Sequence, residues 1–187
     1  MQPNYFNKIL FKLKVRTARL RQAVYRLKGL SVGDDSQIGK IYCDWPKNLS
    51  FGSSCEVRDR CSFRFNHPFK DSNQIVIGND VFIGDGCEFN CSSSIHIGND
   101  CLIASKCIFV DVGHFFKRDI LIRNQKVSTE PIIVGEDVWL GSGCIITQGV
   151  TIGKGSVIAA GSVVVKSIPE NEVWGGVPAR FIKKRDL

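Results

Sequence analysis

The chain has 187 residues, 43% of them hydrophobic, and a formal net charge of +7 at pH 7. This length and composition suit one soluble globular domain with a sizeable core. No apolar run approaches the length of a membrane-spanning helix. The N-terminus also lacks the apolar stretch and small-residue cleavage site of a secretion signal. We therefore expect neither a membrane-spanning helix nor a secretion signal.

The positive charge is concentrated at the N-terminus. Eight of the 25 Lys and Arg residues lie in residues 1–30, which contain no Asp or Glu, so the rest of the chain is nearly neutral. Apolar residues recur there at helical steps, namely Phe6, Leu10, Leu13, Leu20, Val24 and Leu27. Gly29 is a plausible stop signal. The pattern predicts a basic amphipathic helix over residues 1–30.

Two roles for this helix stay open and are compatible. It could attach the protein to an anionic membrane surface, or it could cap the open sheet edge of the region that follows and pack between subunits. Nucleic-acid binding is less expected, because the basic charge is confined to one segment and no nucleic-acid module accompanies it.

Residues 31–169 are dominated by a six-residue repeat. Apolar residues keep this spacing in several runs, the longest being Val134, Leu140, Ile146, Ile152, Ile158 and Val164. Neither an α-helix nor a simple alternating strand has period six, and hexapeptide repeats are typical of parallel β-helices. Gly often follows the apolar residue, which we attribute to backbone dihedrals that are open mainly to Gly. Three repeats would make one triangular turn of eighteen residues, the spacing from Val134 to Ile152.

The chain has eight cysteines, and six occupy the fourth place after the apolar residue of a repeat: Cys55, Cys61, Cys87, Cys101, Cys107 and Cys144. Val and Ser fill the same place in other repeats, so we interpret these cysteines as small buried hydrophobic residues. No C-x-x-C pair is present. Many thiols without a disulfide framework favour a reducing compartment, hence the cytosol.

The repeat is interrupted over residues 64–76 and 115–130. Long loops in a regular solenoid are usually functional. His114 stands just before the second interruption, where a rigid coil would hold it beside a loop.

Three further motifs accompany the repeat: V-W-L-G-S-G at 138–143, S-I-P-x-N at 167–171 and G-V-P-A-R at 176–180. With them the chain resembles hexapeptide-repeat acyltransferases over residues 32–183, most specifically over 77–183. The galactoside, maltose and polysaccharide O-acetyltransferases are the nearest group. The resemblance implies an all-β solenoid, a left-handed parallel β-helix that assembles as a homotrimer. It also implies acetyl-CoA in a groove between coils, active sites shared by two subunits, and a C-terminal tail, residues 170–187, that contributes to CoA binding.

By this resemblance, His114 matches the catalytic histidine of the family. Acetyl transfer to a hydroxyl needs a base, and imidazole can accept a proton near neutral pH. A positioned general base contributes about 10²–10⁴ in rate. His67 and His96 are weaker candidates, because one lies in a loop and the other on a coil edge.

The resemblance also implies the residues that bind the acyl donor. The backbone N–H of Ser142 would face the thioester carbonyl, Gly141 would let the backbone approach closely, and Trp139 would lie beside the site. The remaining donor contacts would come from Ala160, Val165, Lys166, Arg180 and Lys183. The first three match positions along the pantetheine arm, and the two basic tail residues match positions near the CoA phosphates. Many relatives have Thr in place of Val165.

On the acceptor side, Glu88 and Asn90 match a region that holds sugar hydroxyls, although relatives often carry Asn in place of Glu88. The helical cap of the small-sugar transferases is not found, and the basic helix stands in its place. We therefore expect an O-acetyltransferase for a bacterial surface polysaccharide, such as a capsule, lipopolysaccharide or exopolysaccharide precursor. It would act by direct transfer, without a metal, in the cytoplasm or at the inner face of the membrane.

Three other hypotheses stay open. The acceptor could be a nucleotide-sugar amine, an antibiotic or serine. The coil could be a zinc lyase, although the three histidines show no metal-ligand spacing. It could also be a scaffold without catalytic activity, since solenoids provide extended binding surfaces.

Overall fold

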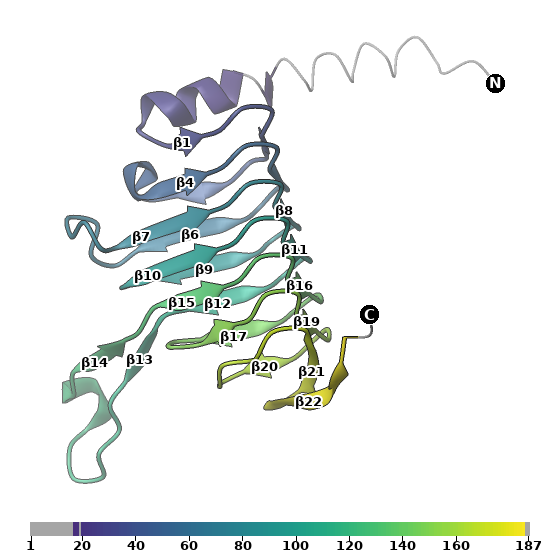
Figure 1. Cartoon of the computed structure of the whole chain (residues 1–187). Coiled ribbons are helices and arrows are strands. Elements are labelled where there is room, and N and C mark those ends of the chain that lie inside the picture. The colour runs from purple at the N-terminus through teal and green to yellow at the C-terminus, as the bar shows by residue number, and fades with distance from the viewer. Residues whose placement is uncertain (1–16, 19, 186–187) are drawn as a thin grey trace.

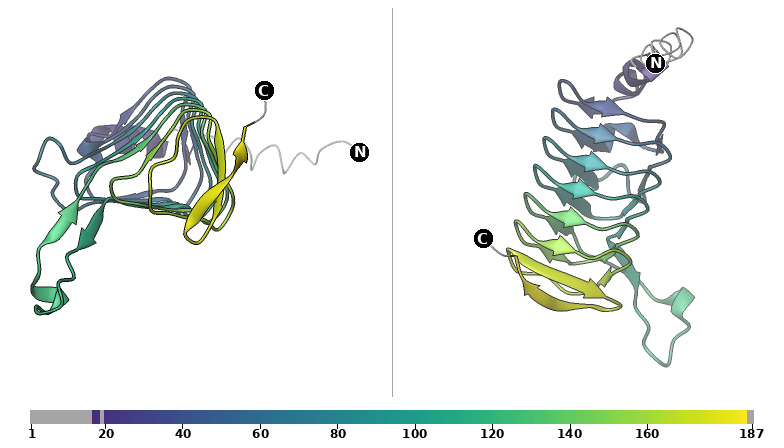
Figure 2. Two further views of the ribbon diagram at one scale, coloured as in Figure 1. Left: turned by 60° about the horizontal axis from the view of Figure 1, so that its bottom comes forward. Right: turned by 90° about the vertical axis from the view of Figure 1, so that its right-hand side faces the viewer.

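The computed structural model describes residues 17–18 and 20–185. The chain winds into a three-sided parallel β-helix whose coils stack in sequence order (Figures 1 and 2). The predicted fold class, an all-β left-handed solenoid of hexapeptide repeats, is confirmed. Each coil contributes one short strand to each of three faces, so residues far apart along the chain lie in adjacent rungs.

The three faces are parallel sheets, apart from one antiparallel pair at the end of the second. The first face contains β1 (Ser31–Val32), β4 (Leu49–Phe51), β7 (Gln74–Ile77), β10 (Ser94–Ile97), β15 (Ile132–Val134) and β18 (Thr151–Ile152). The second contains β2 (Gln37–Ile38), β5 (Glu56–Val57), β8 (Phe82–Ile83), β11 (Leu102–Ile103), β16 (Trp139–Leu140), β19 (Val157–Ile158), β21 (Glu172–Gly176) and β22 (Ala179–Lys184). The third contains β3 (Tyr42–Cys43), β6 (Ser62–Phe65), β9 (Glu88–Cys91), β12 (Ile108–Val110), β17 (Ile145–Thr147) and β20 (Val163–Val164). We call the corner between the second and third faces the second edge, and the corner between the third and first faces the third edge.

The apolar residue of each hexapeptide points into the coil and stacks on its equivalents. Phe63, Phe89 and Phe109 are fully buried, and their rings stack with centroids 4.8 and 4.6 Å apart. All eight cysteines are free and seven are buried, which confirms the interpretation of the repeat cysteines as core residues. Burial raises the pKa of Cys101 to about 11, so this thiol is protonated at neutral pH.

The glycines that follow the apolar residues serve a different purpose from the one predicted. Positive φ angles occur elsewhere, at turn residues such as Asp80, Asp100 and Asp137. What requires Gly at these positions is the approach of the next coil. A Cβ added at Gly33 would lie 2.5 Å from the carbonyl carbon of Gly52, which is closer than carbon atoms can pack.

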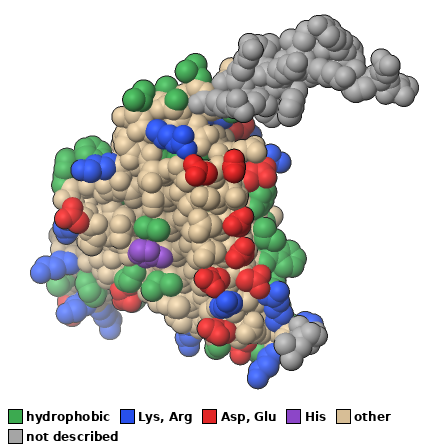
Figure 3. All heavy atoms as spheres, turned by 45° about the horizontal axis from the view of Figure 1, so that its top comes forward, with side chains coloured by type: hydrophobic (Ala, Val, Ile, Leu, Met, Phe, Trp, Pro, Cys, Tyr) green, Lys and Arg blue, Asp and Glu red, His purple; other side chains and the backbone are tan. Residues whose placement is uncertain are grey.

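Acidic side chains form a column along one edge of the prism (Figure 3).

Other segments close the ends or project from the coil. Residues 17–18 and 20–27 are helical and lie over the first coil (Figure 1); the rest of the helix predicted for 1–30 lies outside the described residues, apart from the turn after residue 27. The first interruption consists of turns between β6 and β7, and η1 (Pro46–Asn48) lies one coil before it. The second is a hairpin of β13 (Val112–His114) and β14 (Val127–Thr129), with η2 (Ile122–Asn124) between them, and it projects from the coil (Figure 2).

Candidate functional site

His114 lies at the root of the projecting hairpin, at the third edge. Its residue pairs with Val127 across the antiparallel strands β13 and β14. The hairpin leaves the coil at Asp111 and returns at Glu130, whose backbone N–H donates to the Asp111 carbonyl at 3.1 Å. His114 is therefore only three residues from the coil, and its side chain is exposed. This places an imidazole on a firmly held backbone with free access from outside.

Gln148 fastens the hairpin to the next coil. Its side-chain amide donates to the Ser128 hydroxyl at 2.9 Å. A Cβ added at Gly113 would lie 2.7 Å from the Gln148 Nε2 atom, so a side chain at Gly113 would displace this contact. Sequence analysis did not select Gln148. The only signal was a large polar residue directly before Gly149.

Asp111 stabilises the coil beneath the hairpin. Its carboxylate is fully buried and accepts hydrogen bonds from the backbone N–H groups of Ser92 at 2.6 Å and Ser93 at 2.8 Å. Burial raises the pKa of the Asp111 carboxyl above its ordinary value. Because these contacts turn the carboxylate towards the preceding coil, its role is to support the backbone that carries His114.

The second edge carries Ser142 and Ala160 in adjacent coils. The Gly161 N–H donates to the Ser142 carbonyl at 2.8 Å. A Cβ added at Gly141 would lie 2.5 Å from the Ala160 nitrogen, so Gly is required at position 141 for the coils to pack. Trp139 precedes this turn on β16, with 53% of its side chain exposed on the second face.

The backbone N–H groups along the second edge differ from coil to coil. The Lys40 N–H donates a hydrogen bond to the Asp59 carboxylate of the next coil at 2.7 Å. The Asp85 N–H likewise donates to the Ser105 hydroxyl at 3.1 Å. Ser142 occupies the equivalent position, but the residue below it is Ala160, which has no side-chain acceptor. Within residues 17–18 and 20–185, the Ser142 N–H has no hydrogen-bond partner. It can therefore donate to an oxygen atom of a bound molecule.

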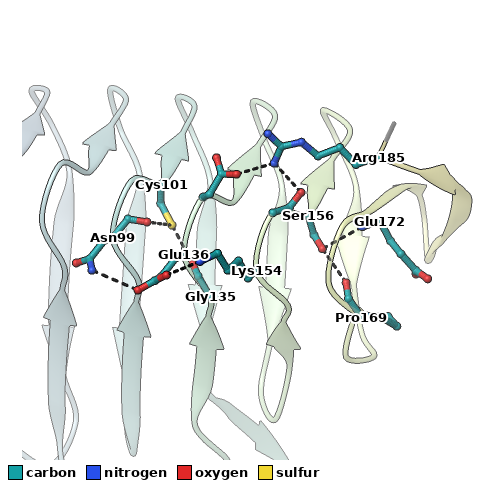
Figure 4. A network of polar contacts seen from close by, with 11 residues as sticks. Asn99, Cys101, Gly135, Glu136, Lys154, Ser156, Pro169, Glu172 and Arg185 are labelled. Atoms are coloured by element: carbon teal, nitrogen blue, oxygen red, sulfur yellow. Dashed lines mark hydrogen bonds and ion pairs between the residues drawn. The ribbon is translucent and has the colours of Figure 1, made fainter. Parts of the chain in front are cut away.

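The C-terminal hairpin packs directly against this edge. The Gly176 N–H donates to the Ser162 hydroxyl at 3.1 Å, and β21 pairs with β19. Arg185 fixes the far end, since its Nη1 atom lies 2.7 Å from the Asp137 carboxylate and 3.0 Å from the Gly155 carbonyl (Figure 4).

The tail thereby places its two candidate basic residues on the rungs that follow Trp139 and Ala160. Lys183 stands opposite Val173, in a row that runs through Val157 to Trp139. Arg180 stands opposite Gly175, and a Cβ added at Gly175 would lie 3.0 Å from the Ala159 Cβ.

The remaining candidate residues lie at or near the third edge. Val165 and Lys166 follow β20, so they share an edge with His114. Glu88 and Asn90 lie on β9, on the third face between the two edges.

The candidate residues therefore form two groups in one chain. Trp139, Gly141, Ser142, Ala160 and the tail gather on the second face and second edge, whereas His114, Val165 and Lys166 gather at the third edge. Residues 142–148 cross the third face between them, which is roughly 20 Å at about 3.3 Å per residue. One chain alone does not bring the two groups into a single pocket.

The three histidines are also dispersed. His67 lies in the turns after β6, His96 on β10 of the first face, and His114 on β13. Among the described residues, no group of three or more His, Cys, Asp or Glu side chains is arranged to hold a metal ion.

Comparisons with known proteins agree with the repeat architecture. A family model described as the hexapeptide repeat of succinyl-transferase matches residues 74–105 and 131–166. Galactoside O-acetyltransferase of Escherichia coli K12 is 37% identical over 139 residues, which cover 74% of this chain and 58% of that protein. The chain belongs to the hexapeptide-repeat acyltransferase family.

Two solved acyltransferase structures share the fold. A mutant of AntD, an N-acyltransferase from Bacillus cereus in complex with dTDP-4-amino-4,6-dideoxyglucose and coenzyme A, superimposes with a TM-score of 0.75 at 25% identity, covering 89% of each chain. The hexapeptide-repeat acetyltransferase VCA0836 from Vibrio cholerae, complexed with acetyl-coenzyme A, gives a TM-score of 0.61 at 26% identity, covering 90% of this chain and 78% of that one. The chain spans less than two thirds of the length of its curated relative, galactoside O-acetyltransferase.

Proposed function

We propose that this family member is an acetyl-CoA-dependent O-acetyltransferase that modifies a sugar hydroxyl of a bacterial surface polysaccharide or its precursor. The observation that carries the proposal is the open N–H of Ser142, which lies on the edge against which the tail hairpin packs. The related galactoside O-acetyltransferase and the acetyl-CoA complex of VCA0836 support the choice of donor.

In this proposal acetyl-CoA lies along the second edge. The Ser142 N–H donates to the thioester carbonyl, where negative charge develops during attack, and such a donor contributes about 3 kcal/mol to the transition state. Trp139 covers the acetyl end, and Ala160 adjoins the pantetheine arm. Arg180 and Lys183, two rungs further on, bind the phosphates, for which the fork of Arg and the point charge of Lys are both suited.

His114 acts as the general base. It accepts the proton of the sugar hydroxyl while the oxygen attacks the thioester carbon. The carbon–sulfur bond then breaks, and the imidazolium gives the proton to the leaving thiolate of CoA. Transfer is direct, without a covalent acyl-enzyme. The exposed position of His114 lets an acceptor larger than the site approach from outside.

We infer a homotrimer, because the two groups of residues lie about one face apart. A threefold axis parallel to the axis of the β-helix can bring the third edge of one subunit against the second edge of its neighbour. His114, Val165 and Lys166 of one chain would then complete the site that Trp139, Ser142 and Ala160 of the next chain begin. The third face between the edges would offer Glu88 and Asn90 to the hydroxyls of the sugar.

The surface polysaccharide is proposed from the N-terminal segment. Its basic charge suits contact with the inner face of an anionic membrane, where the enzyme would meet lipid-carried glycans from the cytoplasmic side. Within the described residues, no helix combines the length and hydrophobicity needed to cross a bilayer.

Two measurements test the function. Calorimetry should detect binding of acetyl-CoA, and mass spectrometry of candidate glycans incubated with protein and acetyl-CoA should detect one added acetyl group. A protein that fails to bind acetyl-CoA would instead favour a scaffold without catalytic activity.

The alternative is N-acetylation of a nucleotide-sugar amine. The fold similarity to AntD, whose complex contains dTDP-4-amino-4,6-dideoxyglucose, favours this second candidate. The same base could take a proton from an attacking amine. Assaying one amino sugar nucleotide beside its hydroxyl counterpart separates the two functions. An N-acetyltransferase would acetylate only the amino sugar.

A further inference from the structure

The N-terminal helix packs on the coil with the side that carries Arg21, Gln22 and Tyr25, and Tyr25 also contacts the hydrophobic core. The Arg21 guanidinium donates to the Ile38 carbonyl at 3.1 Å, and the Gln22 amide donates to the Ser36 carbonyl at 3.0 Å. The Tyr25 hydroxyl lies 3.2 Å from both the carbonyl and the N–H of Ile41. These contacts satisfy backbone groups at the open end of the first coil, where no earlier strand is available to pair with them.

The apolar side of the same helix faces away from the coil. Leu20, Val24 and Leu27 are 69%, 41% and 88% exposed. Their spacing places them on one helix face, the face that a helix of a globular protein normally buries. A stripe of large aliphatic side chains left open in this way marks an interaction surface.

Basic residues accompany the stripe. Arg26 and Lys28 are exposed, and residues 1–30 carry eight basic side chains and no acidic one. The helix-bearing end of the molecule shows hydrophobic and basic side chains close together (Figure 3). The exposed acids Asp34 and Asp35 follow the helix and line a hollow together with Arg26 and Leu27. The helix segment itself carries only basic charge beside its apolar stripe, which is typical of helices that lie in the surface of an anionic membrane.

We propose that Leu20, Val24 and Leu27 form a docking surface that inserts into an anionic lipid bilayer. The proposal identifies the residues that would make the membrane contact included in the proposed function. It rests on that function only for its biological purpose. Charge decides between a bilayer and a second copy of the helix. Two copies of the helix would bring like charges together, because residues 1–30 contain no acidic residue. Anionic headgroups instead attract the segment, and each nearby Lys or Arg contributes about 1 kcal/mol to membrane binding.

Docking of this kind fixes the distance of the catalytic end from the lipid. The helix lies across the end of the first coil (Figure 1), so the coil axis would stand away from the membrane. The His114 hairpin follows the fourth coil. With about 4.8 Å per coil and about 10 Å for the helix layer, His114 would lie roughly 20–25 Å above the headgroups. At that height the site would reach sugar units of a lipid-carried glycan and not its lipid.

Sedimentation of the full chain with vesicles tests the proposal. The protein should bind vesicles that contain phosphatidylglycerol, bind vesicles of phosphatidylcholine alone much less, and be released by high salt. The double variant Leu20→Ser/Leu27→Ser should weaken binding by about tenfold or more. The matched control Phe69→Ser/Ile133→Ser removes exposed apolar side chains elsewhere (85% and 43% exposed) and should bind like the wild type.

Circular dichroism and acetyl-CoA binding establish that each variant is folded. Unchanged vesicle binding by the Leu20/Leu27 variant would overturn the proposal. So would a fall in its oligomeric mass with vesicle binding unchanged, because the stripe would then be a contact between subunits. Failure of acetyl transfer with intact vesicle binding would overturn the proposed function and leave the docking surface standing.

Discussion

The two edges of the third face use different means to position the group that we propose acts in catalysis. At the second edge the coil runs without interruption, and the group is the backbone N–H of Ser142, which stacks on Ala160, a residue without a side-chain acceptor. At the third edge the coil is broken by a hairpin, and the group is the His114 side chain, held by strand pairing and by Gln148. A regular coil can expose backbone donors, but it needs an insertion to place a large side chain outside its own surface.

The largest effect is expected from removing the proposed base at the third edge. His114→Ala should lower CoA-thiol release in the presence of acceptor by about 10²–10⁴, while acetyl-CoA binding persists, because the donor lies at the other edge. His96→Ala on the first face is the control and should retain activity. A fully active His114→Ala protein would remove this residue from the mechanism.

Mixing variants of the two edges tests whether the edges come from different chains. His114→Ala and Ala160→Asp should each be inactive alone, the second because its carboxylate would close the Ser142 N–H as Asp59 closes that of Lys40. Coexpressed in equal amounts, they should recover about one quarter of wild-type activity, since a site between neighbouring subunits can combine two intact edges. No recovery in mixed trimers would mean that each chain builds its own site.

A milder change sharpens the role of the open donor. Ala160→Ser places a hydroxyl below Ser142, as Ser105 lies below Asp85, and should reduce kcat/KM for acetyl-CoA by roughly 10- to 100-fold. Asp59→Ala makes the reverse change at the Lys40 N–H, at the first coils and away from the proposed site, and should leave the kinetics unchanged. Steady-state kinetics at varied acetyl-CoA compares them, and equal values for Ala160→Ser and wild type would contradict the assigned role of the N–H.

The smallest effect concerns stability beneath the third edge. Asp111→Asn keeps one carbonyl oxygen but turns an amide towards the second of the two donors, Ser92 and Ser93. Leaving one buried N–H unsatisfied should lower the free energy of unfolding by about 1–3 kcal/mol. Urea denaturation measures this. Ser93→Ala, which keeps the backbone N–H, should change the midpoint much less.

The sequence predicts the coil well because a six-residue period has one architectural meaning. It also predicts six of the seven buried cysteines, since each of these six stands in a place that Val or Ser fills elsewhere, whereas the burial of Cys91 was not predicted. The predicted reason for the glycines, special backbone dihedrals, was wrong. They are required because the next coil approaches closely, and this crowding depends on which residue stacks on which. The stacking of Gly33 on Gly52 appears only when the coils are aligned.

The same limit applies to the site. The open donor at Ser142 depends on Ala160 in the next coil, and the contrast with Asp85 and Ser105 needs a three-dimensional alignment. For the helix, the sequence identifies an apolar face but not its direction. Leu20 and Leu27 turn outward because the side that packs on the coil is needed for the backbone groups of the first coil.

The antiparallel strand β22 has a consequence for assembly. A solenoid that ended on a parallel strand would present the same pattern of backbone groups that its own coils recognise, and further chains could add to it end to end. Because β22 runs against β21, its outer rim does not repeat that pattern. Reversal of a single strand thus opposes filament growth at the second face, while the side chains of the N-terminal helix occupy the opposite end.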